Sequence, residues 1–142
     1  IVIPIKGTGR PPGDITSDEM RKLADLADRE ACSLILTTGG TGPALRDVTP
    51  EAVKPLFEKE IEGFAILFHM MSFAKVGTST IQSRACAGVA RGTYIFCLPG
   101  SPSACRDAWE GMLKFQLDAR HRPCNFVEIL PRLEEHQKRG KG

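Results

Sequence analysis

The sequence predicts an α/β protein with an open, mostly parallel sheet and helices on its faces. Short apolar runs rich in β-branched residues alternate with longer stretches whose apolar residues recur at helical spacing. Two of the expected strands, 33–37 and 93–98, lead through glycine-containing loops into expected helices. With 142 residues, 42% of them hydrophobic, residues 1–142 are expected to form a single domain with its own core.

The first expected elements lie within the first thirty or so residues. Residues 1–5 are an apolar, β-branched run that favours a strand, and Pro4 marks its edge or end. Residues 7–13 are rich in glycine and proline, which indicates a loop. Ser17 can cap a helix over 18–30.

A buried strand over 33–37 is expected to end in a glycine loop over 38–42. Thr49, as a helix cap with Pro50 in the first turn, then predicts a helix that continues to residue 61. Its expected buried face consists of Val53, Leu56, Phe57 and Ile61. The residues expected on a solvated helix face are Glu58, Glu60 and Glu62.

The second half of the chain predicts a helix, a hairpin and another helix. Gly63 is expected to interrupt the helical pattern before a helix over 64–73. Residues 84–89 and 93–98 predict two strands joined by a turn at 90–92.

For the C-terminal part of the chain, the sequence predicts one helix followed by irregular structure. A helix is expected over 103–117. From residue 118 the chain is mostly polar, so irregular structure is expected there, with a flexible tail over 128–142.

Charge and cysteine usage limit the class of protein. The net charge of +2 gives no reason to expect nucleic acid or an anionic membrane as a partner. No apolar stretch approaches roughly 18 residues and no signal-peptide pattern opens the chain, so a soluble, cytoplasmic protein is expected. The cysteines form no Cys-x-x-Cys pair and are interpreted as small buried hydrophobes in a reducing compartment. They are Cys32, Cys86, Cys97, Cys105 and Cys124.

The glycine loop is the first candidate for a ligand site. It consists of Thr38, Gly39, Gly40, Thr41 and Gly42 and follows a buried strand. In open α/β sheets, ligands bind outside the carboxyl ends of strands, and glycines let backbone N–H groups approach a phosphate. The loop has neither the ending of a P-loop nor the glycine spacing of a dinucleotide fingerprint. A tight connecting turn is the structural alternative.

Two aspartates stand before expected helices. Asp47 precedes the helix that begins near Thr49, so it is either a helix cap or a carboxylate aimed at a metal–phosphate centre. Asp14, before the helix over 18–30, is by itself an ordinary loop acid.

A second strand-to-helix junction and one arginine complete the candidates from pattern alone. Residues 98–102 could take an anion at a helix start, or Ser101 could simply cap that helix. Arg84 could pair with a phosphate or with a nearby carboxylate. His69 is interpreted as packing. No His/Cys cluster has metal-ligand spacing, and no Gly-x-Ser-x-Gly motif supports a serine hydrolase.

Four segments together resemble the MoaB/MogA family of molybdenum-cofactor biosynthesis proteins. They are Leu-Ile-Leu-Thr-Thr-Gly-Gly-Thr-Gly at 34–42, Arg-Asp-Val-Thr-Pro-Glu-Ala at 46–52, Ser-Arg-Ala-Cys-Ala-Gly at 83–88 and Leu-Pro-Gly-Ser-Pro at 98–102. Each segment is weakly specific, but all four in order and spacing are highly specific. The resemblance covers about residues 30–127 and is closest to the bacterial MoaB branch.

The resemblance implies a three-layer α/β/α domain that assembles as a trimer or a hexamer. It also implies molybdopterin adenylyltransferase activity, in which AMP is transferred from ATP to the molybdopterin phosphate with Mg²⁺ required. This chemistry suits the residues, because phosphoryl-type transfer depends on positioning and charge neutralisation rather than on a covalent nucleophile.

Site residues follow from the resemblance position by position. Asp47 matches the catalytic aspartate and is the expected Mg²⁺ ligand. Asp14 matches a second family aspartate and is the other expected catalytic residue. Ser72 and Ser83 match molybdopterin-binding serines. The remaining expected ligand-binding residues are the glycine loop from Thr38 to Gly42, Arg84, Pro99, Gly100 and Ser101.

The sequence departs from the family at its start. The family's opening strand and the Asp-x-Ser-Gly segment after it have no counterpart, so this region is expected to be missing or replaced by residues 1–13. Three alternatives to the transferase stay open. They are a non-catalytic molybdopterin or nucleotide carrier, a molybdate-inserting role like that of MoeA proteins, and a scaffolding subunit.

Overall fold

The computed structural model describes residues 2–4 and 33–135, and their strands form a five-stranded sheet in the order β1-β2-β5-β4-β3. The strands are β1 (Val2–Pro4), β2 (Leu34–Thr38), β3 (Lys59–Glu60), β4 (Cys86–Ala90) and β5 (Thr93–Leu98). β1, β2 and β5 are parallel neighbours, whereas β4 is antiparallel to both β5 and β3. Only β4 therefore runs against the other described strands, and the expected open, mostly parallel sheet is confirmed.

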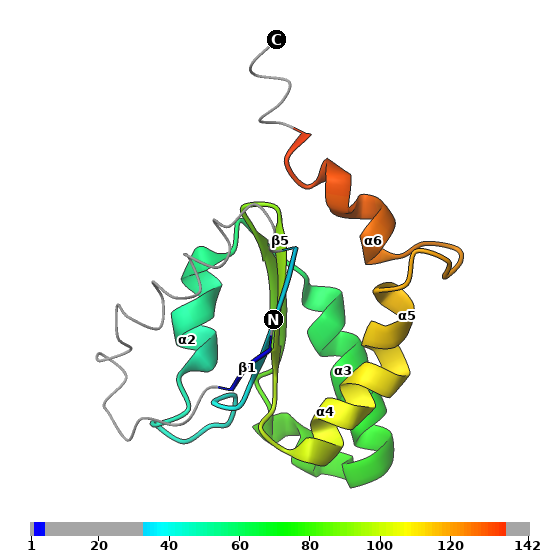
Figure 1. The fold of residues 1–142 in the computed structure, drawn as a ribbon. Helices are drawn as coiled ribbons and strands as arrows, with labels where there is room; N and C mark the ends of the chain where they lie inside the picture. The colour runs from blue at the N-terminus through cyan, green and yellow to red at the C-terminus, as the bar shows by residue number, and fades with distance from the viewer. Residues whose placement is uncertain (1, 5–32, 136–142) are drawn as a thin grey trace.

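Helices cover both faces of the sheet and make three layers (Figure 1). α2 (Thr49–Val53) lies on one face, and α3 (Glu62–Val76) and α4 (Pro102–Ala108) lie on the other. α3 continues into the 3₁₀ turns of η3 (Gly77–Gln82). α4 continues into the π-helical η4 (Trp109–Leu113) and then α5 (Lys114–Gln116), so the expected helix over 103–117 is confirmed.

Two cores follow from the alternation of side chains along β5. Tyr94, Phe96 and Leu98 pack with α3 and α4, while Ile95 and Cys97 pack with α2 on the opposite face. All six residues of β5 are buried, as expected for a central strand covered on both faces.

The predicted hairpin is confirmed. Ala90 pairs with Thr93 in the antiparallel register of β4 and β5, which leaves Arg91 and Gly92 as a two-residue turn. Both turn residues have positive φ, 51° and 76°, the geometry of the type I′ turns that match strand twist.

The helix predicted over 49–61 is wrong beyond its first part. α2 ends at Val53, and Pro55 lies in the 3₁₀ turn η2 (Lys54–Leu56), because proline cannot donate its backbone nitrogen within a helix. The chain then becomes the edge strand β3, and Glu58 donates its N–H to Val89 at 2.8 Å. Glu58 and Glu60 are therefore not on a helix face, whereas Glu62 begins α3.

The helix predicted over 64–73 is longer at both ends in the structure. Gly63 lies in the first turn of α3 rather than before it, so the expected interruption is wrong. His69 accepts or donates a hydrogen bond at Thr80 Oγ1 over 3.0 Å and packs edge-on against Phe68, as its packing interpretation predicted.

The C-terminal part is more ordered than expected. Asn125 caps α6 (Phe126–Ile129) by accepting from the N–H of Glu128 at 2.9 Å. The ring of Phe126 lies 4.9 Å from that of Tyr94, which also donates to the Phe126 carbonyl. η5 (Leu130–Arg132) follows, and its Leu130 packs on the core, so the irregular structure predicted after 118 is wrong for this stretch. The rest of the expected tail, from residue 136, lies outside the described residues.

The cysteines divide into two groups. Cys86 and Cys97 are buried register partners in β4 and β5, and the hydrogen bond between their thiols, together with burial, raises the pKa of Cys97. Cys97 is therefore an inert core thiol, as predicted. Cys105 is half-buried, but Cys124 is exposed, so the buried interpretation is wrong for Cys124. Cys32, Asp14 and the helix predicted over 18–30 lie outside the described residues.

Candidate functional site

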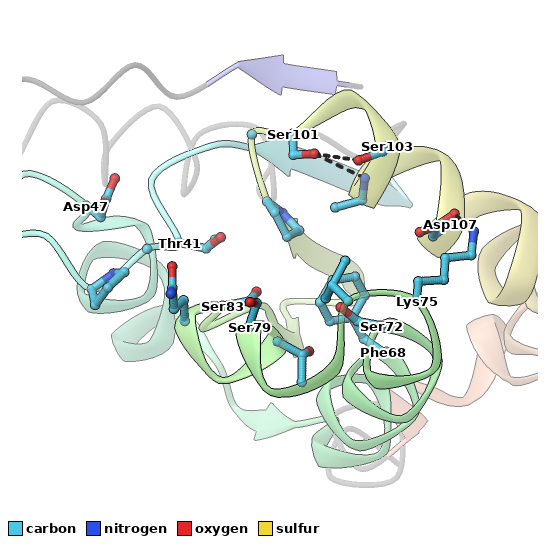
Figure 2. A pocket seen from close by; sticks show the side chains of 18 of the residues that line it. Thr41, Asp47, Phe68, Ser72, Lys75, Ser79, Ser83, Ser101, Ser103 and Asp107 are labelled. Atoms are coloured by element: carbon cyan, nitrogen blue, oxygen red, sulfur yellow. Dashed lines mark hydrogen bonds and ion pairs between the residues drawn. The ribbon is translucent and has the colours of Figure 1, made fainter.

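A cavity of about 710 Å³ lies at the edge of the sheet where β2 and β5 end. Its walls come from the loops after these two strands, from α3 and η3, and from the start of α4 (Figure 2). Because β2 and β5 are parallel neighbours, their loops meet at the same edge. The cavity is therefore in the position that the sequence predicted for a ligand site.

The glycine loop has a backbone that other residues could not easily adopt. Gly39 and Gly40 have φ of 100° and 69°, in the region that favours glycine. Gly39 donates its N–H to the Leu98 carbonyl at 2.9 Å, and the Thr49 hydroxyl donates to the Gly39 carbonyl at 2.8 Å. Thr49 thus holds the loop and is not the cap of α2, whose N-cap is Val48.

The members of the glycine loop divide into cavity-lining and supporting residues. Gly40, Thr41 and Gly42 line the cavity, and Thr38 and Gly39 do not. The Thr38 hydroxyl instead donates to the Pro99 carbonyl at 3.0 Å and contacts the thiol of Cys105. Thr38 therefore links the ends of β2 and β5 beneath the cavity.

Asp47 lines the cavity and is half-buried. A Cβ added at Gly42 would lie 2.6 Å from an Asp47 carboxylate oxygen, so glycine is required there for this approach. Within the part of the chain that the structure describes, this carboxylate makes no ion pair and does not cap α2. The cap interpretation is therefore wrong, and the carboxylate remains available to a ligand.

Arg84 holds the same loop and does not line the cavity. Its Nε donates to the Gly42 carbonyl at 2.9 Å, and its Nη2 donates to the Asp47 carbonyl. The guanidinium also pairs with Glu51 in α2. Of its two predicted roles, pairing with a carboxylate is confirmed, and contact with a ligand phosphate stays a prediction.

The loop after β5 supplies the opposite wall. Pro99, Gly100 and Ser101 line the cavity, and a Cβ at Gly100 would lie 3.3 Å from Gly39 Cα. Ser101 is the N-cap of α4 and accepts from the N–H of Ala104 at 3.4 Å. Its predicted cap role and its predicted place in the pocket wall are therefore compatible.

Hydroxyl groups dominate the rest of the lining. The predicted Ser72 and Ser83 both line the cavity. Sequence reasoning missed the further polar lining residues, which are Lys75, Ser79, Thr80, Gln82, Ser103, Arg106 and Asp107. Three of them, Ser79, Thr80 and Gln82, belong to the hydroxyl-rich run that follows α3 and folds as η3, and this run is the sequence signal that could have indicated them.

The donor set limits the metal chemistry. Within 2–4 and 33–135, no group of three or more His, Cys, Asp or Glu side chains could hold a metal ion. Mg²⁺ is usually bound through one or two carboxylates together with ligand phosphates. Asp47 therefore fits an Mg²⁺ shared with a phosphate-bearing ligand, and it does not fit a metal site made of protein alone.

Comparison with known proteins identifies the family. A family model described as "Probable molybdopterin binding domain" matches residues 12–119. A crystal structure of molybdenum cofactor biosynthesis protein B aligns with a TM-score of 0.70 and 34% identity, over 82% of this chain and 67% of that one. The chain belongs to the MoaB/MogA family.

Two further members of the family show how much of the length is shared. Molybdenum cofactor biosynthesis protein B of Escherichia coli is 59% identical over 93 residues, which are 66% of this chain and 55% of that protein. A protein of Methanocaldococcus jannaschii named probable molybdopterin adenylyltransferase is 54% identical over 74 residues, which are 52% of this chain and 45% of that protein. The chain thus spans about half the length of the curated relatives it matches.

Proposed function

We propose that this MoaB/MogA family member acts in molybdenum cofactor biosynthesis as a cytoplasmic, Mg²⁺-dependent molybdopterin adenylyltransferase. An oxygen of the molybdopterin phosphate would form a bond to the α-phosphorus of ATP while the bond from that phosphorus to pyrophosphate breaks. The products would be adenylyl-molybdopterin and pyrophosphate. The name of the Methanocaldococcus jannaschii relative supports this reaction.

The observation that carries the proposal is the Asp47 carboxylate beside the glycine loop. It lines the cavity and makes no ion pair within the described part of the chain. A carboxylate in this state is suited to an Mg²⁺ that a nucleotide brings with it. When bound, Mg²⁺ would neutralise charge on the phosphates.

The chain's own residues would position the reactants. The backbone of Gly40, Thr41 and Gly42 lets a phosphate approach closely, and Ser72 and Ser83 offer hydroxyl donors. Orientation of this kind can lower the barrier substantially without a covalent nucleophile. The buried thiols of Cys86 and Cys97 lie outside the lining and have no role in the step.

The test is pyrophosphate release from ATP with molybdopterin and Mg²⁺, for the wild type and for Asp47→Asn. We expect the variant to lose at least about 100-fold in turnover, because a charge that orients the reacting group is removed. Asp118→Asn is the matched control, since Asp118 pairs with Arg120 away from the cavity. Equal turnover in Asp47→Asn and wild type would disprove the role of Asp47.

A carrier is the second candidate, and the small donor set favours it. Asp47 and Asp107 are the carboxylates among the lining residues, and Asp107 is paired with Lys75. The cavity could therefore hold a pterin phosphate or a nucleotide without transferring AMP. Tight molybdopterin binding with no pyrophosphate release would establish the carrier, and its loss in Ser83→Ala would locate the ligand.

We also propose that the chain self-associates, as the trimer or hexamer that the family resemblance implied. Ile66, Met70 and Phe73 recur at helical spacing on α3 and are about 60%, 65% and 59% exposed. An exposed apolar stripe of this kind marks an interaction surface. Light scattering on Phe73→Ser should report a smaller mass than the wild type, whereas Ile129→Ser on α6 is the control.

α3 and the η3 turns that follow it form a long apolar segment. Among the described residues, one segment, Glu62–Gln82, is long and apolar enough to cross a membrane by length and composition. Phe64 and Phe68 pack into the core, and Lys75 pairs with Asp107 on α4. We therefore propose that another copy of the chain, rather than a lipid bilayer, covers the exposed face.

A further inference from the structure

The end of the cavity opposite Asp47 is charged. Lys75, in the last turn of α3, and Asp107, on α4, reach toward each other there (Figure 2). They form an ion pair that joins the two helices. Arg106, the residue before Asp107, also lines the cavity.

The balance of charge at this end is positive. Asp107 neutralises one cation, and Arg106 makes no ion pair with any residue in the described part of the chain. The Lys75 side chain is 62% exposed, whereas that of Asp107 is 21% exposed. The carboxylate is thus the more enclosed partner and restrains the amine at the cavity rim.

Lys75 keeps the capacity to bind a second anion. An ammonium group has three donors, and Asp107 accepts from one of them. Arg106 adds a planar guanidinium, which suits the oxygens of a phosphate group. Hydroxyl groups of Ser72 and Ser103 lie in the same cavity lining.

We propose that Lys75 and Arg106 form an anion subsite for a phosphate group of the ligand, and that Asp107 competes with this group for Lys75. The inference rests on the proposed function for the identity of the ligand. The cavity would then keep two negatively charged groups of the ligand apart. One would lie beside Asp47 and its metal, and the other would lie at Lys75 and Arg106. The phosphate could belong to a nucleotide polyphosphate or to a phosphate monoester.

Calorimetric titration with inorganic tripolyphosphate and with phenyl phosphate, in the absence of Mg²⁺, tests the subsite without turnover. We expect Lys75→Met and Arg106→Met each to weaken binding about tenfold, as for loss of one charge-assisted hydrogen bond. Weaker binding of tripolyphosphate alone assigns the subsite to the nucleotide. Weaker binding of phenyl phosphate assigns it to a monoester, and unchanged binding of both probes overturns the proposal.

Asp107→Asn gives a prediction of opposite sign. The amide oxygen can still accept from Lys75 while the competing charge is gone, so binding of the probe should tighten about threefold. Binding that stays the same or weakens would disprove competition by Asp107. A purely structural role for the ion pair would lower the midpoint of urea unfolding without tightening the binding.

A second exposed ion pair provides the matched control. Lys114 and Glu110 pair at 2.6 Å between η4 and α5, and neither residue lines this cavity. Lys114→Met and Glu110→Gln should leave binding of both probes unchanged. Since the titration needs no AMP transfer, loss of the subsite and failure of the transferase proposal give separate results.

Discussion

The loops that follow β2 and β5 differ in what holds them in place, although both line the same cavity. The loop after β2 carries Asp47 and is held from outside itself, by Arg84 from before β4 and by Thr49 from α2. The bond from Arg84 to Gly42 joins residues 42 positions apart. The loop after β5 is held by neutral hydrogen bonds. The Thr38 hydroxyl and the Cys105 thiol both donate to its Pro99 carbonyl, at 3.0 and 2.9 Å. Ser101 adds the cap, which bonds to Ala104 three residues away.

This difference suggests that the loop after β2 positions a functional side chain, whereas the loop after β5 mainly lines the cavity. The loop that carries Asp47 is held by charge-assisted hydrogen bonds to two of its carbonyl groups, at Gly42 and Asp47. The loop after β5 is held by neutral hydrogen bonds at Pro99 and by the cap of α4. Loss of the charge-assisted bonds should therefore move Asp47, whereas loss of the cap should affect mainly the start of α4.

The largest effect is expected from Gly42→Ala. The new Cβ would lie 2.6 Å from an Asp47 carboxylate oxygen and would displace it. A displacement near 1 Å at a reacting centre can cost about 100-fold in turnover, which pyrophosphate release would measure. Gly63→Ala is the control, because a Cβ there meets nothing within 4 Å.

Arg84→Met should have the next largest effect, this time on stability. It leaves the carbonyl groups of Gly42 and Asp47 without their donor, and part-buried groups of this kind cost about 2–3 kcal/mol when unpaired. Urea unfolding would measure the loss, and turnover should fall with it because Asp47 is no longer held. Arg120→Met, which removes an exposed pair with Asp118, should leave both measurements near wild type. Equal losses in the two variants would contradict the special role of Arg84.

The features that sequence predicted correctly depend on local chemistry. The turn at Arg91 and Gly92, the strands on either side of it and the helix after Pro102 all follow from short patterns. The position of the loops after β2 and β5 at the same edge of the sheet was also predicted, because neighbouring parallel strands end at one edge.

The features that could not be predicted from the sequence depend on contacts between residues that are distant along the chain. Residues 58–61 were predicted to be helical, but Lys59 and Glu60 pair with β4 as the edge strand β3. Pairing of Arg84 with a carboxylate was predicted, but only the fold shows that its partner is Glu51. The ion pair of Lys75 with Asp107 depends on how α3 packs against α4, which no local pattern encodes.

A smaller effect is expected from acid, through Glu51. Partial burial raises the pKa of Glu51, but the hydrogen bond and charge of Arg84 lower it more, so its folded pKa lies below the ordinary value of 4.5. Stability from the pair is therefore present above pH 4.5 and is lost as the pH falls through the lowered pKa. The pair is exposed, so Glu51→Gln should cost about 1 kcal/mol or less at pH 7.

The measurement is urea unfolding of wild type and Glu51→Gln between pH 7 and pH 3. The difference between the two proteins should shrink toward zero at the acid end, since the wild-type carboxylate is then protonated as well. A difference that stays constant over this range would mean that packing of Glu51, rather than its charge, holds Arg84.

The smallest effect is expected from Ser101→Ala in the loop after β5. Loss of a helix cap typically costs about 1 kcal/mol, and the long, exposed bond to Ala104 puts this one nearer about 0.5 kcal/mol. That bond is 3.4 Å long. Ser101→Asn should restore the stability, because asparagine also caps helices, and urea unfolding would report both variants.

A loss of stability in Ser101→Ala as large as that in Arg84→Met would remove the contrast between the loops. It would mean that the cap also holds the cavity wall that contacts Gly39. A small loss of stability accompanied by a fall in turnover would instead mean that the Ser101 hydroxyl contacts the bound ligand. The loop after β5 would then contribute a ligand contact, while the loop after β2 positions Asp47.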